Sequence, residues 1–412
     1  MLYIPPFSYN NYLTYKIKKD DTPESVAQEL GMTLYELRSY HNRYCPLKDC
    51  IGPVFPGHLK FLILQSQEEK QEIEKHREPI HFSTKEFKLP FLPSRLNKKY
   101  LAMYTIENGS EKTTIKEEIT VKWLTTDLNG YSLIEINRTA LYVNDDESKS
   151  ISDELAEKTA KIFYPLKVVV NSNGKCVDIY NCNEIRERWD RVKKEVLKEF
   201  QGEAVEERLK AYEFKLRDND IISESFMKDW FLRAFFNGLN IEYLETLTIE
   251  KIVEFPISQK IGELQFRVQQ TIFPTVDQYN LVNITQKGFL TDNRSKDDFE
   301  NNLLFPYDSL NEKQCEKVEG TYEAYYFLDP NKNTIDSLFL QCEIKLDIPQ
   351  KITITISDLE DTGKLILDGK INLYVPAQKK EPSLLREFFW AIVVIIVLLA
   401  AVVWVFVKLN KT

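Results

Sequence analysis

The stretch YLAMYTIENG, residues 100–109, predicts the first arm of a β-hairpin, because an apolar run ends at an Asn-Gly pair. In the alternating segment that follows, apolar residues fall on one face, at Ile115, Ile119, Val121 and Trp123. Strand-like runs joined by Asn-Gly turns recur at Asn129-Gly130, before 131–143, and at Asn173-Gly174, between 163–170 and 176–180. These turns predict antiparallel strands that follow one another along the chain.

Further strand-like runs occupy the second half of the same region, at 264–273, 279–286, 322–328, 337–346, 352–356 and 365–374. Between the two sets, apolar residues recur at three- and four-residue steps from Ile185 to Phe200 and from Val205 to Leu216. A third helix is expected from Phe226 to about Gly238. Region 98–376 is therefore predicted to be a mostly antiparallel β domain with a helical insert, which makes the protein multidomain α+β.

The C-terminal segment FFWAIVVIIVLLAAVVWVFV, Phe388 to Val407, contains no charged residue, Pro or Gly. A helix of this length spans about 30 Å, the thickness of a bilayer's hydrocarbon core. Trp390 and Trp404 lie near its ends, where aromatic belts form. We expect a transmembrane helix that contacts the lipid bilayer, preceded by a juxtamembrane linker at 377–387 and followed by a short tail at 408–412.

The N-terminus, MLYIPPFSYN, has neither a basic segment nor the apolar core of a signal peptide. We therefore expect a single-pass, C-terminally anchored membrane protein with a cytoplasmic head, and a periplasmic head is the alternative. The formal net charge of −9 provides no basic field, so nucleic acid is not expected as a partner.

Residues 1–65 form a separate compact unit, joined to the large domain by a charged, Pro-bearing linker at 66–97. A short strand-like run leads through Asp20-Asp21-Thr22-Pro23 into an apolar-periodic segment. Thr22 is a predicted N-cap, and Pro23 fits the first helical position. The run Leu30-Gly31-Met32-Thr33 breaks this helix before a second one, and residues 55–62 supply a Pro-Gly turn and a closing strand.

This pattern resembles the LysM family over residues 14–65. The resemblance implies a βααβ fold that binds N-acetylglucosamine-type glycans such as peptidoglycan. Carried over by position, the glycan groove would be formed by Asp21, Thr22, Pro23, Pro56 and Gly57. Gly57 would permit a positive φ in its turn. Asp20 replaces the family's usual Gly, Pro23 replaces a usual Leu, and the stretch 42–56 is longer than typical, so glycan binding and protein contact remain alternative uses of this unit.

The overall arrangement is similar to that of signal-less LysM proteins encoded beside contractile, type VI-like secretion machinery in some bacteria. That similarity implies a membrane-anchored, non-enzymatic binding or scaffold protein, an adaptor or effector of such a system. The alternative is an envelope protein that binds peptidoglycan.

All four histidines precede residue 82, and no phosphate loop or nucleophile elbow is present, so no enzyme and no cofactor are expected. His41, Cys45, Cys50 and His58 have side chains that suit zinc, but their spacing matches no zinc motif, and no metal is predicted. Two close pairs, Cys45/Cys50 and Cys176/Cys182, are expected to be reduced in a cytosolic head and able to oxidise outside the cytosol.

Overall fold

The computed structural model describes residues 8–359, except 47–48, 67–70, 72–77, 81, 83–86, 144–154, 156–158, 160, 259–261, 278 and 308–315. The expected strand at 365–374 and the segments 377–387, 388–407 and 408–412 lie outside the described residues.

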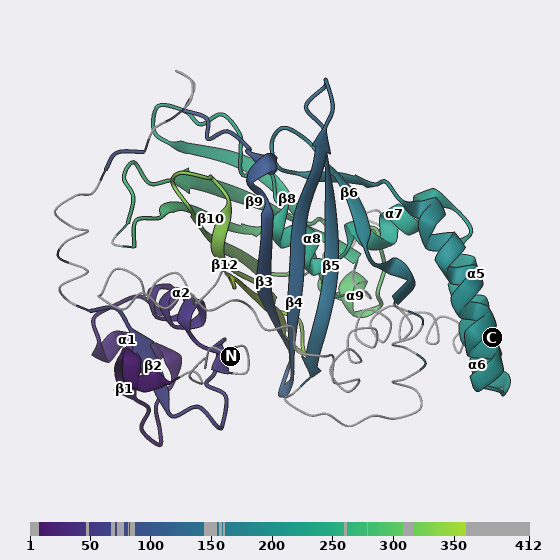
Figure 1. The fold of residues 1–412 in the computed structure, drawn as a ribbon, viewed down its shortest axis with the longest axis horizontal. Coiled ribbons are helices and arrows are strands. Elements are labelled where there is room, and N and C mark those ends of the chain that lie inside the picture. Colours follow the sequence, from purple (N-terminus) through teal and green to yellow (C-terminus); the bar gives the residue numbers. More distant parts are fainter. Residues whose placement is uncertain are drawn as a thin grey trace, which may run out of the picture.

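One eleven-stranded antiparallel sheet dominates the described chain, with the strand order β7-β6-β5-β4-β3-β13-β12-β11-β10-β9-β8 (Figure 1). Its first five strands in sequence are β3 (Asn97–Asn108), β4 (Glu111–Thr126), β5 (Ser132–Val143), β6 (Leu166–Val170) and β7 (Cys176–Ile179). The other six are β8 (Thr248–Ser258), β9 (Gly262–Ile272), β10 (Val282–Leu290), β11 (Gly320–Leu328), β12 (Ile335–Ile344) and β13 (Gln350–Asp358). Each set is a meander of sequential neighbours, and the pairing of β13 with β3 joins the two sets into one sheet.

The Asn-Gly turns between strands of the first meander form as predicted. Asn108 pairs with Glu111 across a two-residue turn, and Gly109 has a φ of +59°. Gly130 and Gly174 also adopt positive φ, at +82° and +76°, in the turns that lead into β5 and β7. Left-handed backbone is easily reached only by residues such as glycine, so these positions determine where the chain reverses.

Four helices connect β7 at one edge of the sheet to β8 at the other. They are α5 (Cys182–Glu199), α6 (Glu203–Leu216), α7 (Asn219–Met227) and α8 (Trp230–Phe235). The single helix expected at 226–238 is wrong: Asp229 starts a new helix, because its carboxylate accepts a hydrogen bond from the backbone N–H of Leu232 at 3.0 Å. Phe235 of α8 packs edge-on against Tyr100 of the sheet, with ring centroids 4.9 Å apart, so the crossing chain shares the sheet's core.

The N-terminal unit consists of β1 (Leu13–Lys16), α1 (Pro23–Glu29), α2 (Leu34–Tyr44) and β2 (Phe61–Leu64), with β1 antiparallel to β2. The expected cap is confirmed: the Thr22 hydroxyl accepts from the N–H of Ser25 at 3.1 Å, and Pro23 is the first helical residue. Short helices complete the described elements: η1 (Tyr9–Asn11), η3 (Pro93–Arg95), η4 (Lys161–Phe163) and α9 (Lys296–Glu300).

The predicted fold class is corrected by this arrangement. The described chain is mostly one large antiparallel sheet with few helices, not a multidomain α+β assembly of a LysM module, a β domain and a transmembrane helix. One reason is that the N-terminal unit shares a hydrophobic cluster with the sheet, in which Tyr44, Cys45 and Cys50 pack with Leu101 of β3. A compact unit that buries its side chains on its neighbour is not independent of it.

The predicted membrane anchor is corrected as well. In the part of the chain that the structure describes, no helix is long and apolar enough to cross a bilayer. The structure thus gives no support to a single-pass location or to bilayer contact through 388–407, a segment outside the described residues.

Candidate binding site

The turn before α1 contributes three of the predicted groove residues. The Asp21 carboxylate is half-buried and accepts hydrogen bonds from the Tyr15 hydroxyl at 2.9 Å and from the Lys18 N–H at 2.7 Å. Thr22 is exposed, whereas Pro23 is buried beneath it. Thr22 is thus the predicted residue of this turn that is most open to a ligand.

The other two predicted groove residues lie in the turn before β2. Pro56 is buried, and its carbonyl oxygen accepts from the N–H of Leu59 at 2.9 Å. Gly57 is exposed, and a Cβ added to it would meet no atom within 4 Å. The expected positive φ at Gly57 is wrong, because Gly57 is not among the residues with left-handed backbone. Open space, rather than backbone strain, distinguishes this glycine.

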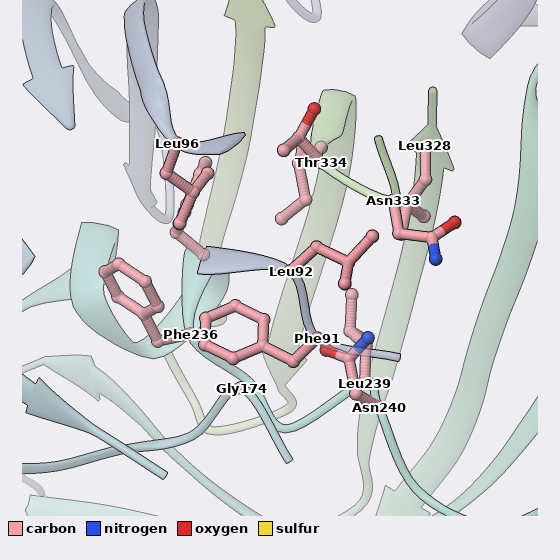
Figure 2. Close-up of a pocket in the computed structure, with 12 residues that line it drawn as sticks. Phe91, Leu92, Leu96, Gly174, Phe236, Leu239, Asn240, Leu328, Asn333 and Thr334 are labelled. Carbon is pink, nitrogen blue, oxygen red and sulfur yellow. The ribbon is translucent and has the colours of Figure 1, made fainter. Parts of the chain in front are cut away.

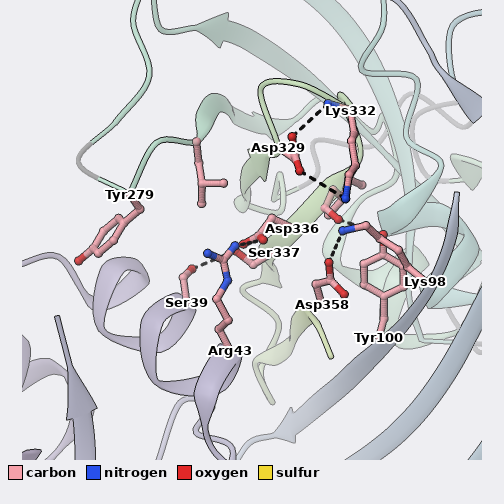
Figure 3. A network of polar contacts seen from close by, with 12 residues as sticks. Ser39, Arg43, Lys98, Tyr100, Tyr279, Asp329, Lys332, Asp336, Ser337 and Asp358 are labelled. Atoms are coloured by element: carbon pink, nitrogen blue, oxygen red, sulfur yellow. Dashed lines mark hydrogen bonds and ion pairs between the residues drawn. The ribbon is translucent and has the colours of Figure 1, made fainter. Parts of the chain in front are cut away.

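Helix α2 attaches the N-terminal unit to the main sheet (Figure 3). Arg43 forms an ion pair with Asp336. The hydroxyl groups of Ser39 and Ser337 are hydrogen-bonded at 3.1 Å. The rings of Tyr35 and Tyr325 stack with their centroids 3.9 Å apart. The loop after α2 also approaches the sheet, since a Cβ at Gly52 would lie 2.9 Å from the side chain of Met103. The docking surface therefore includes α2 and the beginning of this loop.

His41 is a structural residue of the same unit. Its Nδ1 accepts from the backbone N–H of Ile63 at 3.0 Å, and its Nε2 donates to the carbonyl oxygen of Asp49 at 3.1 Å. Burial lowers the pKa of His41 to about 4, so the ring is neutral at pH 7. Since both ring nitrogens are engaged, His41 has no free lone pair to offer a metal.

The other three residues considered as zinc ligands, His58, Cys45 and Cys50, also have partners within the unit. The His58 ring lies 3.0 Å from the Asp49 carboxylate, and the Cys45 and Cys50 sulfurs are 3.5 Å apart as free thiols. Among the described residues, no group of three potential metal ligands comes together. Cys176 and Cys182 are free thiols too, and the Cys176 sulfur lies 3.9 Å from the Met227 sulfur.

A cleft that the sequence analysis missed lies where the β6–β7 turn meets α8 and β8; we call it the β8 cleft. Its volume is about 380 Å³, and its polar lining includes Asn171, Lys175, Arg233, Asn237, Lys251 and Glu254. A neighbouring hollow of about 690 Å³ shares Lys175, Cys176 and Arg233 with it and adds Asp178, Asp220 and Lys228. The β8 cleft falls within the size range of small-molecule sites.

The signal for Lys251 was present in the sequence but weak. Within β8, Lys251 shares a face with Val253, Phe255 and Ile257, so it is a charged residue on a buried, apolar face. Burial, with a smaller contribution from the nearby positive charge of Lys175, lowers the pKa of Lys251 to about 7. Perturbed ionisable groups in clefts are candidates for functional residues.

A second missed cluster is largely buried between the sheet and α8. The Arg138 guanidinium contacts both carboxylate oxygens of Asp229 at 2.6 and 2.7 Å, and its Nη1 lies 3.3 Å from Glu117. The Tyr104 hydroxyl donates to the other oxygen of Glu117. Glu117 lies on the same face of β4 as buried apolar residues, and Arg138 does so in β5. A charged residue at such a position was the signal in the sequence that could have revealed the cluster.

A small cavity lies between the linker at Phe91 and Leu92 and the segment that follows α8 (Figure 2). Its volume is about 30 Å³, and most of its lining is apolar, with Asn240, Asn333 and Thr334 as the polar exceptions. A space of this size holds about one water molecule. It is therefore too small for an organic ligand.

No family model and no curated protein matches the chain. A solved structure concerned with lipid–protein interactions in lipovitellin is similar over 65% of this chain, with 10% sequence identity and a TM-score of 0.35. The similarity covers 25% of the lipovitellin chain, so this chain spans about a quarter of that length. The lipid interactions named there are those of lipovitellin, and membership of the LysM family stays a prediction.

Proposed function

We propose that the protein is a non-enzymatic binding protein whose N-terminal unit binds a glycan containing N-acetylglucosamine. One observation carries the proposal: α2 and the beginning of the loop after it contact the sheet, while Thr22 and Gly57, one from each predicted groove turn, stay exposed. The sheet then acts as a scaffold that holds the unit without covering either residue.

The local geometry is compatible with a shallow sugar site. Because the Asp21 carboxylate is fixed by Tyr15 and Lys18, the turn before α1 is preorganised. The absence of any atom near a Cβ at Gly57 leaves space for a sugar ring above the other turn.

The test is binding of the full chain to soluble N-acetylglucosamine oligomers by calorimetry, and to purified peptidoglycan by sedimentation. Gly57→Trp should abolish both, because the new ring would fill the proposed groove. Leu128→Trp is the matched control, since Leu128 is 105% exposed at the β4–β5 turn and lies in the main sheet's part of the chain. If the wild-type chain binds neither ligand, or if the two variants bind equally, the proposal is wrong.

A further inference from the structure

The β8 cleft contains a lysine whose amine is held in place by backbone carbonyl groups. The Lys251 Nζ lies 3.2 Å from the oxygen of Asn237 and 3.3 Å from the oxygen of Gly238. A neutral amine has two N–H donors and one lone pair. With both donors directed at these carbonyls, a neutral Lys251 keeps its lone pair available as a nucleophile.

The backbone of the same region brings a second cation to the cleft. Lys175 forms an isolated antiparallel bridge with Asn237, and the N–H of Gly238 donates to the Gly174 oxygen at 3.3 Å. The turn that carries Lys175 is thereby tied to the segment that holds the Lys251 amine. A neighbouring cation and burial are the two conditions that activate lysine nucleophiles in proteins.

The other charged side chains that line the cleft, Arg233 and Glu254, have partners of their own, and Lys175 is the exposed cation. Arg233 forms an ion pair with Glu263, and Glu254 accepts a hydrogen bond from the Gln265 amide at 3.2 Å. Lys175 is exposed to solvent at the cleft. A ligand that carries a negative group would therefore be attracted to the side of the cleft where Lys175 lies.

We propose that Lys251 captures a small aldehyde or ketone bearing a carboxylate or phosphate group, and holds it as an imine in the β8 cleft. The amine nitrogen attacks the carbonyl carbon and forms a C–N bond. The carbonyl oxygen then leaves as water with the two amine hydrogens, and a C=N bond remains. The step needs no oxidant or reductant, and it is independent of the proposed glycan site.

The size of the effect follows from the protonation of the amine. With a pKa of about 7, about half of the Lys251 amines are neutral at pH 7. An ordinary lysine with a pKa near 10.4 is neutral in only about one molecule in 2,500. Because a less basic amine is also a weaker nucleophile, we expect Lys251 to be modified at least tenfold faster than exposed lysines.

The test uses pyridoxal 5′-phosphate, an aldehyde with a phosphate group, on the full chain, with borohydride trapping and peptide mass mapping. Lys251 should be the first lysine modified at pH 7, and its rate should reach half of its maximum near pH 7. Lys251→Arg replaces the amine by a guanidinium, which forms no imine, and should lose this adduct, whereas Lys228→Arg, in the neighbouring hollow, should keep it. Benzaldehyde, which lacks the anionic group, should react more slowly.

Lys175→Met separates the proposed role of the second cation from general reactivity. Removing its charge should move the half-maximal pH of Lys251 labelling upward and reduce the advantage of pyridoxal phosphate over benzaldehyde. The proposal is overturned if Lys251 reacts no faster than the exposed lysines, or if its rate still rises steeply above pH 9. Both outcomes are measured on the wild-type chain, so they do not depend on a variant's folding.

Discussion

Replacing Glu117 by Gln should stabilise the protein at alkaline pH. The reason is that Glu117 and Asp229 share one guanidinium, that of Arg138, and that Glu117 itself is buried. Asp229 has the better contacts, at 2.6 and 2.7 Å, and it also accepts the N–H of Leu232, whereas Glu117 is 3.3 Å from Arg138. Burial, reinforced by the charge of Asp229 and opposed by Arg138, raises the pKa of Glu117 to about 7.

The magnitude follows from the pKa difference between the folded and unfolded states. A rise from 4.5 to about 7 corresponds to a cost of about 3 kcal/mol for the ionised carboxylate in the fold. Because the folded state has the higher pKa, it binds the proton more tightly, and the cost is absent below pH 4.5. The cost develops between pH 4.5 and about 7 and is complete above that range. Glutamine resembles the protonated side chain, so the gain from Glu117→Gln should follow the same pH dependence.

The assay is urea unfolding of both chains, followed by tryptophan fluorescence at pH 5 and pH 8.5. We expect Glu117→Gln to raise the free energy of unfolding by about 3 kcal/mol at pH 8.5 and by less than about 1 kcal/mol at pH 5. Glu118→Gln is the matched control, because Glu118 is a partly exposed neighbour paired with Lys99 at 3.1 Å. An equal loss of stability at both pH values would refute the reasoning, since it would mean that Glu117 is ionised and favourably paired throughout.

Three further substitutions test the packing and polar contacts of the fold. Gly288→Ala should lower the free energy of unfolding by about 3 kcal/mol, because its Cβ would lie 2.4 Å from the backbone oxygen of Arg267; unchanged urea stability would argue against this close strand approach. Thr22→Ala should cost about 1 kcal/mol by removing the cap of α1, and the same urea titration measures it. Lys98→Met should cost about 3–5 kcal/mol by removing the ammonium group that pairs with the buried Asp358 carboxylate (Figure 3), and adding Asp358→Leu should restore part of the loss if the pair acts as a unit.

Local signals in the sequence predicted local structure well. The Asn-Gly pair at 108–109 gives a two-residue hairpin, and Thr22 with Pro23 begins a helix, because each depends on a few adjacent residues. Strand β8 was missed although its buried residues alternate. Pro256 interrupts that run, and proline in a strand is tolerated mainly at an edge, which is where β8 lies.

Long-range pairing was not predictable by the same means. β13 pairs with β3 across more than 200 residues of intervening chain, and the sequence of neither strand identifies the other as its partner. The candidate sites differ in the same way. Thr22 and Gly57 were predicted through a family resemblance that rests on local turns, whereas Lys251 and Lys175 come together only when the two edges of the sheet are connected.

The β8 cleft exists because of the order of the strands. β7 and β8 lie at opposite edges of the sheet, so the chain between them must cross one face before it can resume the sheet. A half-buried amide anchors this crossing: Asn237 donates to the hydroxyls of Tyr322 and Tyr326, each at 2.8 Å. The carbonyl groups that hold Lys251 belong to Asn237 and Gly238, so the same residues that fix the crossing also position the amine. A fragment that lacks either edge of the sheet would lose this geometry, and for that reason the proposed reactivity of Lys251 should require both edges.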